Sequence, residues 1–146
     1  MSYEFQRVKY DDLNSRQQEN YNFQKVAAHL ADFGFNGIRL SDDWQGADFI
    51  ACHVDGQTFL KVQLKSRLFI QKKYSGKDIY VAFIHRNKDK TEDIYVYPHD
   101  VVRDELLARG EKTGTLTESK SWKVGGGYSW GHLSKGMKEF MQKYRV

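Results

Sequence analysis

The sequence feature that most constrains the fold is the pair Asp55-Gly56 between two apolar-rich segments. Such a pair favours a tight hairpin turn with positive φ. In the segment after it, from Thr58 to Lys65, Leu60, Val62 and Leu64 alternate with Phe59, Lys61, Gln63 and Lys65. Because neighbouring side chains of a strand point to opposite faces, one face belongs to the core and the other carries polar groups. We therefore expect an antiparallel hairpin with its turn at Asp55-Gly56.

The hairpin register can be derived from the turn. Residue numbers that face each other in an antiparallel pair have a constant sum, so pairing Val54 with Gln57 places Asp48 opposite Gln63. Directly opposed side chains lie on the same face of a sheet. Asp48, Gln63 and Lys65 are therefore expected to gather at one end of the hairpin.

The rest of the chain indicates helices around a sheet. A helix is expected from Ser15 to Phe33, with Asn14 or Ser15 as its cap and Gly34 as its end. Glu19 lies four residues before Phe23 and extends the apolar stripe of that helix. Further expected elements are these: a short strand near Ile38 and Leu40, strands over Ala47–Val54, Ile79–Ile84 and Ile94–Tyr97, a helix over Asp100–Arg109, and a last helix capped by Ser134. Asp42 and Asp43 are expected in a loop with Trp44, and the run from Gly125 to Gly127 is expected to be a flexible connection.

Composition limits the class of protein. The 146 residues suit one domain over 1–146, and 40% hydrophobic residues suffice for a core. The lone Cys52 cannot form an internal disulfide, and the absence of an apolar run argues against a membrane span. A cytoplasmic protein without membrane contact is the simplest expectation.

Charge is unevenly distributed along the chain. From Gln57 to Lys90 there are nine Lys and Arg against two Asp, whereas the chain up to Gly56 has an excess of four acids. A basic middle next to an acidic segment fits a surface that contacts phosphate beside a metal site. A solvated lysine-rich surface explains the same charges. The residues that this basic stretch offers to nucleic acid are Lys61, Ser66, Arg67, Lys72 and Lys73.

The expected cluster has the chemistry of phosphodiester hydrolysis. Such hydrolysis needs a divalent cation, an activated water and neutralisation of charge at phosphorus. Asp48 is a hard oxygen ligand that suits Mg²⁺, and the carbonyl oxygens of Gln63 and Leu64 are further candidates. The ammonium of Lys65 can orient the water or neutralise the developing charge, and Glu19 is the best candidate for a further carboxylate. Each residue also has a plain structural explanation: a strand end for Asp48, an exposed lysine for Lys65, and a helix-dipole contact for Glu19.

The run Gly46-Ala47-Asp48-Phe49-Ile50-Ala51, followed by Gln63-Leu64-Lys65-Ser66-Arg67, resembles the PD-(D/E)XK nuclease superfamily. The lysine-serine-arginine run is most similar to the archaeal Holliday-junction resolvases. The resemblance implies an α/β (α+β) restriction-endonuclease-like fold, a central mixed sheet flanked by helices in αβββαβ order. It also implies cleavage of DNA or RNA with Mg²⁺ or Mn²⁺, and a possible homodimer.

By motif position, the resemblance implies that Asp48 binds the metal, Lys65 is the catalytic lysine and Glu19 is the helix carboxylate. Gln63 stands at the second acidic position, where an amide replaces the usual carboxylate, and Ala47 stands where the motif has proline. The alternative is therefore a nuclease-like domain that binds nucleic acid or a protein partner without cutting. A third possibility is an interaction protein whose Trp122, Tyr128 and Trp130 form an interface.

Overall fold

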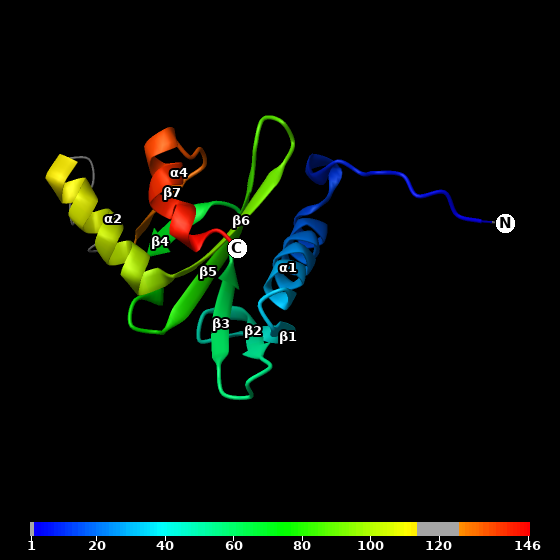
Figure 1. The fold of residues 1–146 in the computed structure, drawn as a ribbon, viewed down its shortest axis with the longest axis horizontal. Helices are drawn as coiled ribbons and strands as arrows, with labels where there is room; N and C mark the ends of the chain where they lie inside the picture. Colours follow the sequence, from blue (N-terminus) through cyan, green and yellow to red (C-terminus); the bar gives the residue numbers. More distant parts are fainter. Residues whose placement is uncertain (1, 114–125) are drawn as a thin grey trace.

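A five-stranded mixed sheet forms the centre of the structure, a computed structural model that describes residues 2–113 and 126–146 (Figure 1). Its strands lie in the order β1-β2-β3-β5-β6, and only β3 and β5 are parallel neighbours. The bounds of these strands are β1 (Phe35–Trp44), β2 (Ala47–His53), β3 (Phe59–Leu64), β5 (Ile79–Arg86) and β6 (Glu92–Pro98). A second sheet pairs β4 (Leu68–Gln71) with β7 (Gly127–Trp130). The expected α+β class with a mixed sheet flanked by helices is confirmed.

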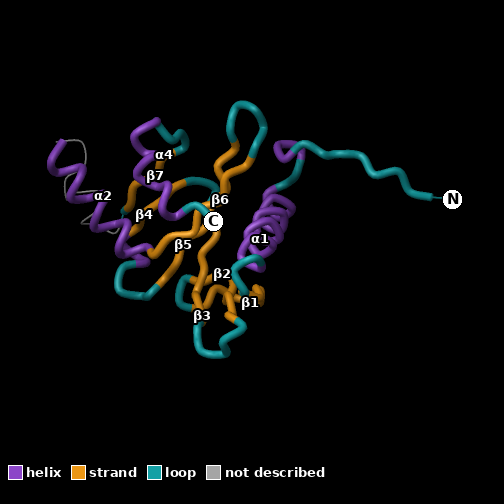
Figure 2. The backbone as a smooth tube through the Cα atoms, viewed as in Figure 1, coloured by secondary structure: helices purple, strands orange, loops and turns teal. Residues whose placement is uncertain are grey.

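The described helices cover both faces of the central sheet. They are α1 (Ser15–Ala31), α2 (His99–Thr113) and α4 (Lys135–Met141). In Figures 1 and 2, α1 lies on one side of the sheet, and α2 and α4 lie with the small sheet on the other. Side chains of β5 alternate between two buried clusters, because Val81 and Phe83 pack with α2 and α4 whereas Ala82 and Ile84 pack with α1. β5 is thus buried on both faces.

Helix α1 begins and ends as its capping residues predict. The Asn14 side chain accepts a hydrogen bond from the backbone of Gln17, whose own side chain accepts from Asn14, so the two form a capping box. The helix ends at Ala31, and Gly34 follows with φ of +84°. The expected extension to Phe33 is wrong, because this side chain lies beyond the last turn and is 53% exposed.

The β2–β3 hairpin has the expected register. Phe49 pairs with Val62 and Ile50 with Lys61, which continues the sum derived from the Asp55-Gly56 turn. Gly56 has φ of +72°, and the Asp55 carboxylate accepts from the backbone N–H groups of Gln57 and Thr58. These hydrogen bonds hold the pKa of Asp55 well below its usual range. The turn therefore keeps the two strands in the register that aligns Asp48 with Gln63.

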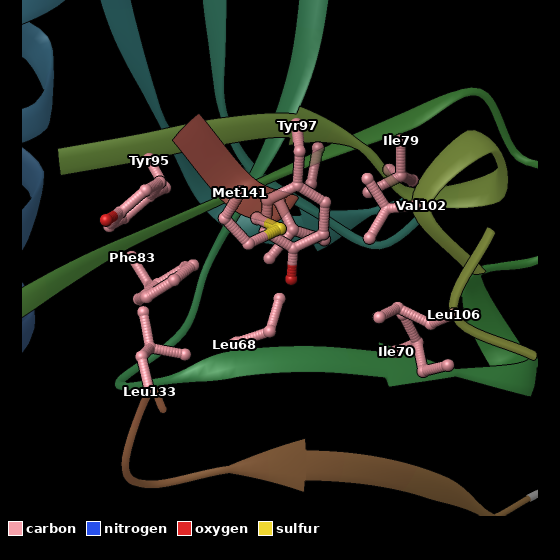
Figure 3. Packing of buried hydrophobic residues seen from close by; sticks show 12 residues of the cluster. Leu68, Ile70, Ile79, Phe83, Tyr95, Tyr97, Val102, Leu106, Leu133 and Met141 are labelled. Atoms are coloured by element: carbon pink, nitrogen blue, oxygen red, sulfur yellow. The ribbon is translucent and has the colours of Figure 1, made fainter. Parts of the chain in front are cut away.

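The link between the parallel strands β3 and β5 contains no helix. It consists of β4 and a 3-10 turn over Lys72–Tyr74, so the element order departs from αβββαβ at this point. The hydroxyl of Tyr97 holds β4 by accepting from the N–H of Phe69 (3.0 Å) and donating to its carbonyl (2.5 Å). Figure 3 shows the Tyr97 ring pointing from its strand toward the ribbon that carries Leu68.

A buried histidine holds the far end of β4. The N–H of Gln71 donates to Nε2 of His99 (3.0 Å), so the ring proton lies on Nδ1, which donates to Asp100 (2.9 Å). His99 is fully buried. Burial lowers its pKa, because a charged ring would be poorly solvated there.

Other expectations about elements were wrong in their bounds. Asp42, Asp43 and Trp44 lie within β1 rather than in a loop, because this strand continues beyond a bulge to the turn at Gln45. Helix α2 continues past Gly110. Gly127 begins β7 rather than a flexible connection, whereas Gly125 and Trp122 lie outside the described residues. Neither β4 nor β7 was expected, since both are short and pair with partners distant in sequence.

Candidate active site

A cavity of about 770 Å³ lies where α1, β1 and the ends of β2 and β3 meet. Three separate elements contribute residues that the sequence predicted for the site. Glu19 comes from α1, Asp48 comes from β2, and Leu64 and Lys65 come from the end of β3. Ser66 also lines it. The cavity therefore brings together Glu19, Asp48, Leu64 and Lys65, but not Gln63, which the hairpin register placed opposite Asp48.

A tight turn positions Asp48 at this cavity. Gln45 and Gly46 form the two-residue link between β1 and β2, and both have positive φ (55° and 84°). A Cβ on Gly46 would lie 3.1 Å from the ring of Tyr74, so the backbone approaches that ring closely. The turn therefore fixes the backbone at Gly46, two residues before Asp48, against the ring of Tyr74.

Asp48 contacts the neighbouring strand through its carboxylate. Its Oδ2 accepts a hydrogen bond from the backbone N–H of Leu64 at 2.8 Å. The next N–H, that of Lys65, donates to Ala82 of β5 on the other side of β3. A side-chain acceptor therefore ends the β2–β3 ladder, and it joins Asp48 directly to the Gln63–Lys65 segment.

The ammonium of Lys65 lies over two aromatic rings. Its Nζ is 4.7 Å from the ring centre of Phe69 and 5.3 Å from that of Tyr74. Ring faces attract cations, so these contacts orient the lysine at the cavity wall. Sequence reasoning did not identify either ring as part of the site, because β4 and the following 3-10 turn approach Lys65 only in the folded chain.

The α1 and β1 walls of the cavity are polar. Glu19 is exposed in the second turn of α1, and Asp42 of β1 lies across the cavity from that helix. Arg39 donates to the side chain of Asn20 and lies over the ring of Phe23 (5.4 Å). These contacts join β1 to α1 at Asn20, the residue after Glu19, and so stabilise the part of α1 that lines the cavity.

Gln63 does not line the cavity. Its side-chain amide donates to the carbonyl of Leu64 at 3.3 Å. Strand alternation puts its side chain on the face opposite to that of Leu64. The carbonyl oxygen of Leu64, which was expected to bind the metal together with Gln63, thus accepts a hydrogen bond from the Gln63 side chain.

The residues predicted to bind nucleic acid are dispersed. The Lys61 ammonium donates to the backbone carbonyl of Lys77. Lys72 and Lys73 are exposed on the 3-10 turn and do not line the cavity, but the Lys73 ammonium lies over the Tyr74 ring that Lys65 also contacts (5.1 Å). Ser66 and Arg67 line a small groove that adjoins the cavity. Ser66, Arg67 and Lys73 therefore lie next to residues of the candidate site, whereas Lys61 is bound elsewhere.

The acidic residues suit a hard metal ion that is bound loosely. In the described parts of the chain, no three side chains from His, Cys, Asp and Glu are grouped as a metal cage. Mg²⁺ is commonly held by one or two carboxylates together with waters and substrate phosphates. Glu19, Asp42 and Asp48 offer such oxygens around one cavity, whereas no histidine or cysteine lines it. The donor set therefore fits Mg²⁺ or Mn²⁺ and not a closed zinc site.

Comparison with known proteins identified no relative of this chain. No protein-family model, curated protein or solved structure matches the chain. Within residues 2–113 and 126–146, no helix has both the length and the apolar character that a membrane crossing requires. The function must therefore be inferred from the chemistry of the site itself.

Proposed function

We propose that this protein is a metal-dependent nuclease that hydrolyses phosphodiester bonds of DNA or RNA. One observation carries the proposal: Glu19, Asp48 and Lys65 come from three different elements and line one cavity of about 770 Å³. Carboxylates next to an ammonium are the groups that this hydrolysis needs. A PD-(D/E)XK nuclease would have the same three residue types in these roles.

Each residue has a distinct task in this proposal. Lys65, oriented by Phe69 and Tyr74, neutralises the negative charge that develops on the phosphate. Asp48 accepts from the N–H of Leu64 and lines the cavity, and Glu19 adds a carboxylate from α1. Ser66 supplies a hydroxyl that can hydrogen-bond a phosphate oxygen.

The cation would be held by Asp48 and Glu19. When bound, Mg²⁺ or Mn²⁺ supplies Lewis-acid polarisation of the phosphate and lowers the pKa of a water. The alternative function is a nuclease-like domain that binds nucleic acid without cutting it. The hydrogen bonds of Asp48 and Gln63 to the backbone of Leu64 favour that alternative, because both side chains then serve the fold.

The two functions are separated by a cleavage assay with the purified full chain. Labelled single-stranded and duplex DNA and RNA are incubated with Mg²⁺ or Mn²⁺, with EDTA as the blank. The nuclease proposal expects Asp48→Asn and Lys65→Ala to lower the cleavage rate by about 10²-fold or more. Asn keeps an oxygen that can accept from Leu64, so this variant tests charge more than folding.

Matched controls remove similar groups outside the cavity. Asp32→Asn and Lys77→Ala change an exposed acid and an exposed lysine that do not line it, and both should retain the full rate. Cleavage that persists in Asp48→Asn and Lys65→Ala at the wild-type rate excludes this site as the source. No cleavage by the wild-type protein, together with metal-independent binding of oligonucleotides, selects the alternative.

A further inference from the structure

A second cavity of about 770 Å³ lies between the β5–β6 hairpin and α4. Figure 2 shows the teal loop that joins β5 to β6 near the purple α4 helix. The ammonium of Lys138 crosses this gap and donates to Oδ1 of Asn87 at 3.3 Å. The cleft is thus formed by two segments about fifty residues apart that contact each other directly.

The cleft is strongly basic. Arg86, Lys88, Lys135 and Lys138 line it, whereas Glu139 is the one carboxylate among its described lining residues. Arg86 pairs with Glu92 (3.2 Å). In the described part of the chain, no carboxylate lies within ion-pair distance of the three lysines. Asp89 interacts with Lys138 at longer range and Glu139 lines the cleft, so these acids offset part of the charge without pairing directly with a lysine.

The pKa of His85, which lines the cleft, reflects both burial and the nearby positive charge. Desolvation lowers the pKa of His85, and the nearby Lys138 and then His132 lower it further. Asn87 and Asp93 act in the opposite direction, but the pKa still lies below its usual value. A group of anionic oxygens placed here would meet lysines that pair directly with no described carboxylate.

A small groove connects this cleft to the candidate active site. The groove of about 190 Å³ shares Ser66 with the first cavity. It shares His85, Arg86 and Gly131 with the basic cleft. Arg67 and Trp130 form its walls, and a side chain at Gly131 would approach the Arg67 guanidinium to 3.2 Å. The shared residues therefore define a path of adjoining hollows from Asp48 and Lys65 past Trp130 to the lysines of α4.

We propose that this path binds one unpaired strand of nucleic acid, with backbone phosphates in the basic cleft. The groove is small, with a volume of about 190 Å³, which favours one strand over the two strands of a duplex. Trp130 is partly exposed there, and an indole ring can stack on any base. The direction of the strand toward Asp48 rests on the proposed function, whereas the affinity of the cleft for phosphates does not.

The test measures binding by fluorescence anisotropy without metal, so that cutting plays no part. The probes are labelled single-stranded DNA of about 4 and about 16 nucleotides, which bracket the single-strand footprints of small domains, and a duplex of the longer sequence. Lys135→Gln/Lys138→Gln should weaken binding of the longer single strand about tenfold. The variant should also reduce the magnitude of the slope of log K against log salt concentration by about 1.4, because each lost contact to a phosphate of a single strand removes about 0.7.

Two control pairs make the result specific. Lys77→Gln/Lys143→Gln removes the same charge from exposed positions outside all three cavities and should change affinity less than twofold. Lys88→Gln/Lys135→Gln repeats the test without disturbing the Lys138–Asn87 hydrogen bond. Equal losses in the control pair and the cleft pairs, or no loss in either cleft pair, overturn the inference.

Other occupants of the cleft give different outcomes. Tighter binding of the duplex than of the single strand overturns the inference in favour of a duplex surface. Poly-glutamate that competes as well as DNA overturns it in favour of an acidic protein partner. A protein that cuts DNA with unchanged binding in the cleft variants retains the proposed function and loses this inference. If the protein never cuts, but binding falls as expected in the cleft variants, this inference is retained and the proposed function is lost.

Discussion

Asp48 and Leu64 are joined by a hydrogen bond of 2.8 Å from the Leu64 backbone N–H to a carboxylate oxygen of Asp48. It forms where the β2–β3 ladder ends, and Leu64 is only partly buried. The same carboxylate that is proposed to bind a metal therefore also stabilises a strand end. Substitutions that keep or remove the acceptor oxygen of Asp48 separate its contribution to stability from its proposed role in metal binding.

Asp48→Ala should lower the free energy of unfolding by about 1–3 kcal/mol, because it leaves the N–H of Leu64 without its acceptor. Asp48→Asn should cost less, since its amide oxygen can still accept. Urea denaturation of both variants measures the difference. Equal destabilisation would show that the charge of Asp48, rather than its acceptor oxygen, supports the fold.

Glu19→Gln and Gln63→Glu should affect metal binding differently. Glu19 lines the candidate cavity whereas Gln63 does not. Titration calorimetry with Mn²⁺ should therefore show weaker binding in Glu19→Gln and no gain in Gln63→Glu. A large gain in Gln63→Glu would mean that this side chain can turn into the cavity, and it would bring back the ligand role expected from the motif.

Tyr97→Phe should destabilise the protein by about 1–3 kcal/mol, because both the N–H and the carbonyl of Phe69 lose their partner. Tyr95→Phe is the matched control. Tyr95 is also buried and stacks on Phe83, but no hydrogen bond links its hydroxyl to the described residues. Thermal unfolding should show a clear loss for the first variant and little for the second. A loss of the same size in both would assign the effect to ring packing.

Stability should fall as pH decreases below about 6.5, the usual pKa of histidine. Burial lowers the pKa of His99 in the folded state, so the unfolded chain takes up the proton first. The unfolded state then binds more protons, and the free energy of unfolding decreases with falling pH. His85 acts in the same direction.

The measurement is urea denaturation at several pH values between 7 and 5. His99→Gln should have a shallower pH dependence than the wild type, in addition to a lower stability throughout. His29→Gln changes an exposed histidine and should follow the wild-type slope. Parallel curves for His99→Gln and the wild type would show that His99 does not take up a proton on unfolding in this range.

Local sequence signals predicted the part of the fold that carries the site. The Asp55-Gly56 turn predicted the register of β2 and β3, and the register aligned Asp48 with Gln63. Asn14 and Gly34 predicted the limits of α1 to within a few residues. These features depend on turn geometry and capping between near neighbours, which a sequence displays directly.

The sequence by itself determined which residues are available for chemistry and which hairpin aligns Asp48 with the Gln63–Lys65 segment. Tertiary structure decided which of them share a cavity. Glu19 comes in from α1, Phe69 and Tyr74 orient Lys65, and Gln63 turns toward a backbone carbonyl instead. Tertiary structure also paired β4 with β7 and placed α4 next to the β5–β6 hairpin. Such contacts join segments far apart in the chain, so their geometry depends on the packing of the whole core and not on any local pattern.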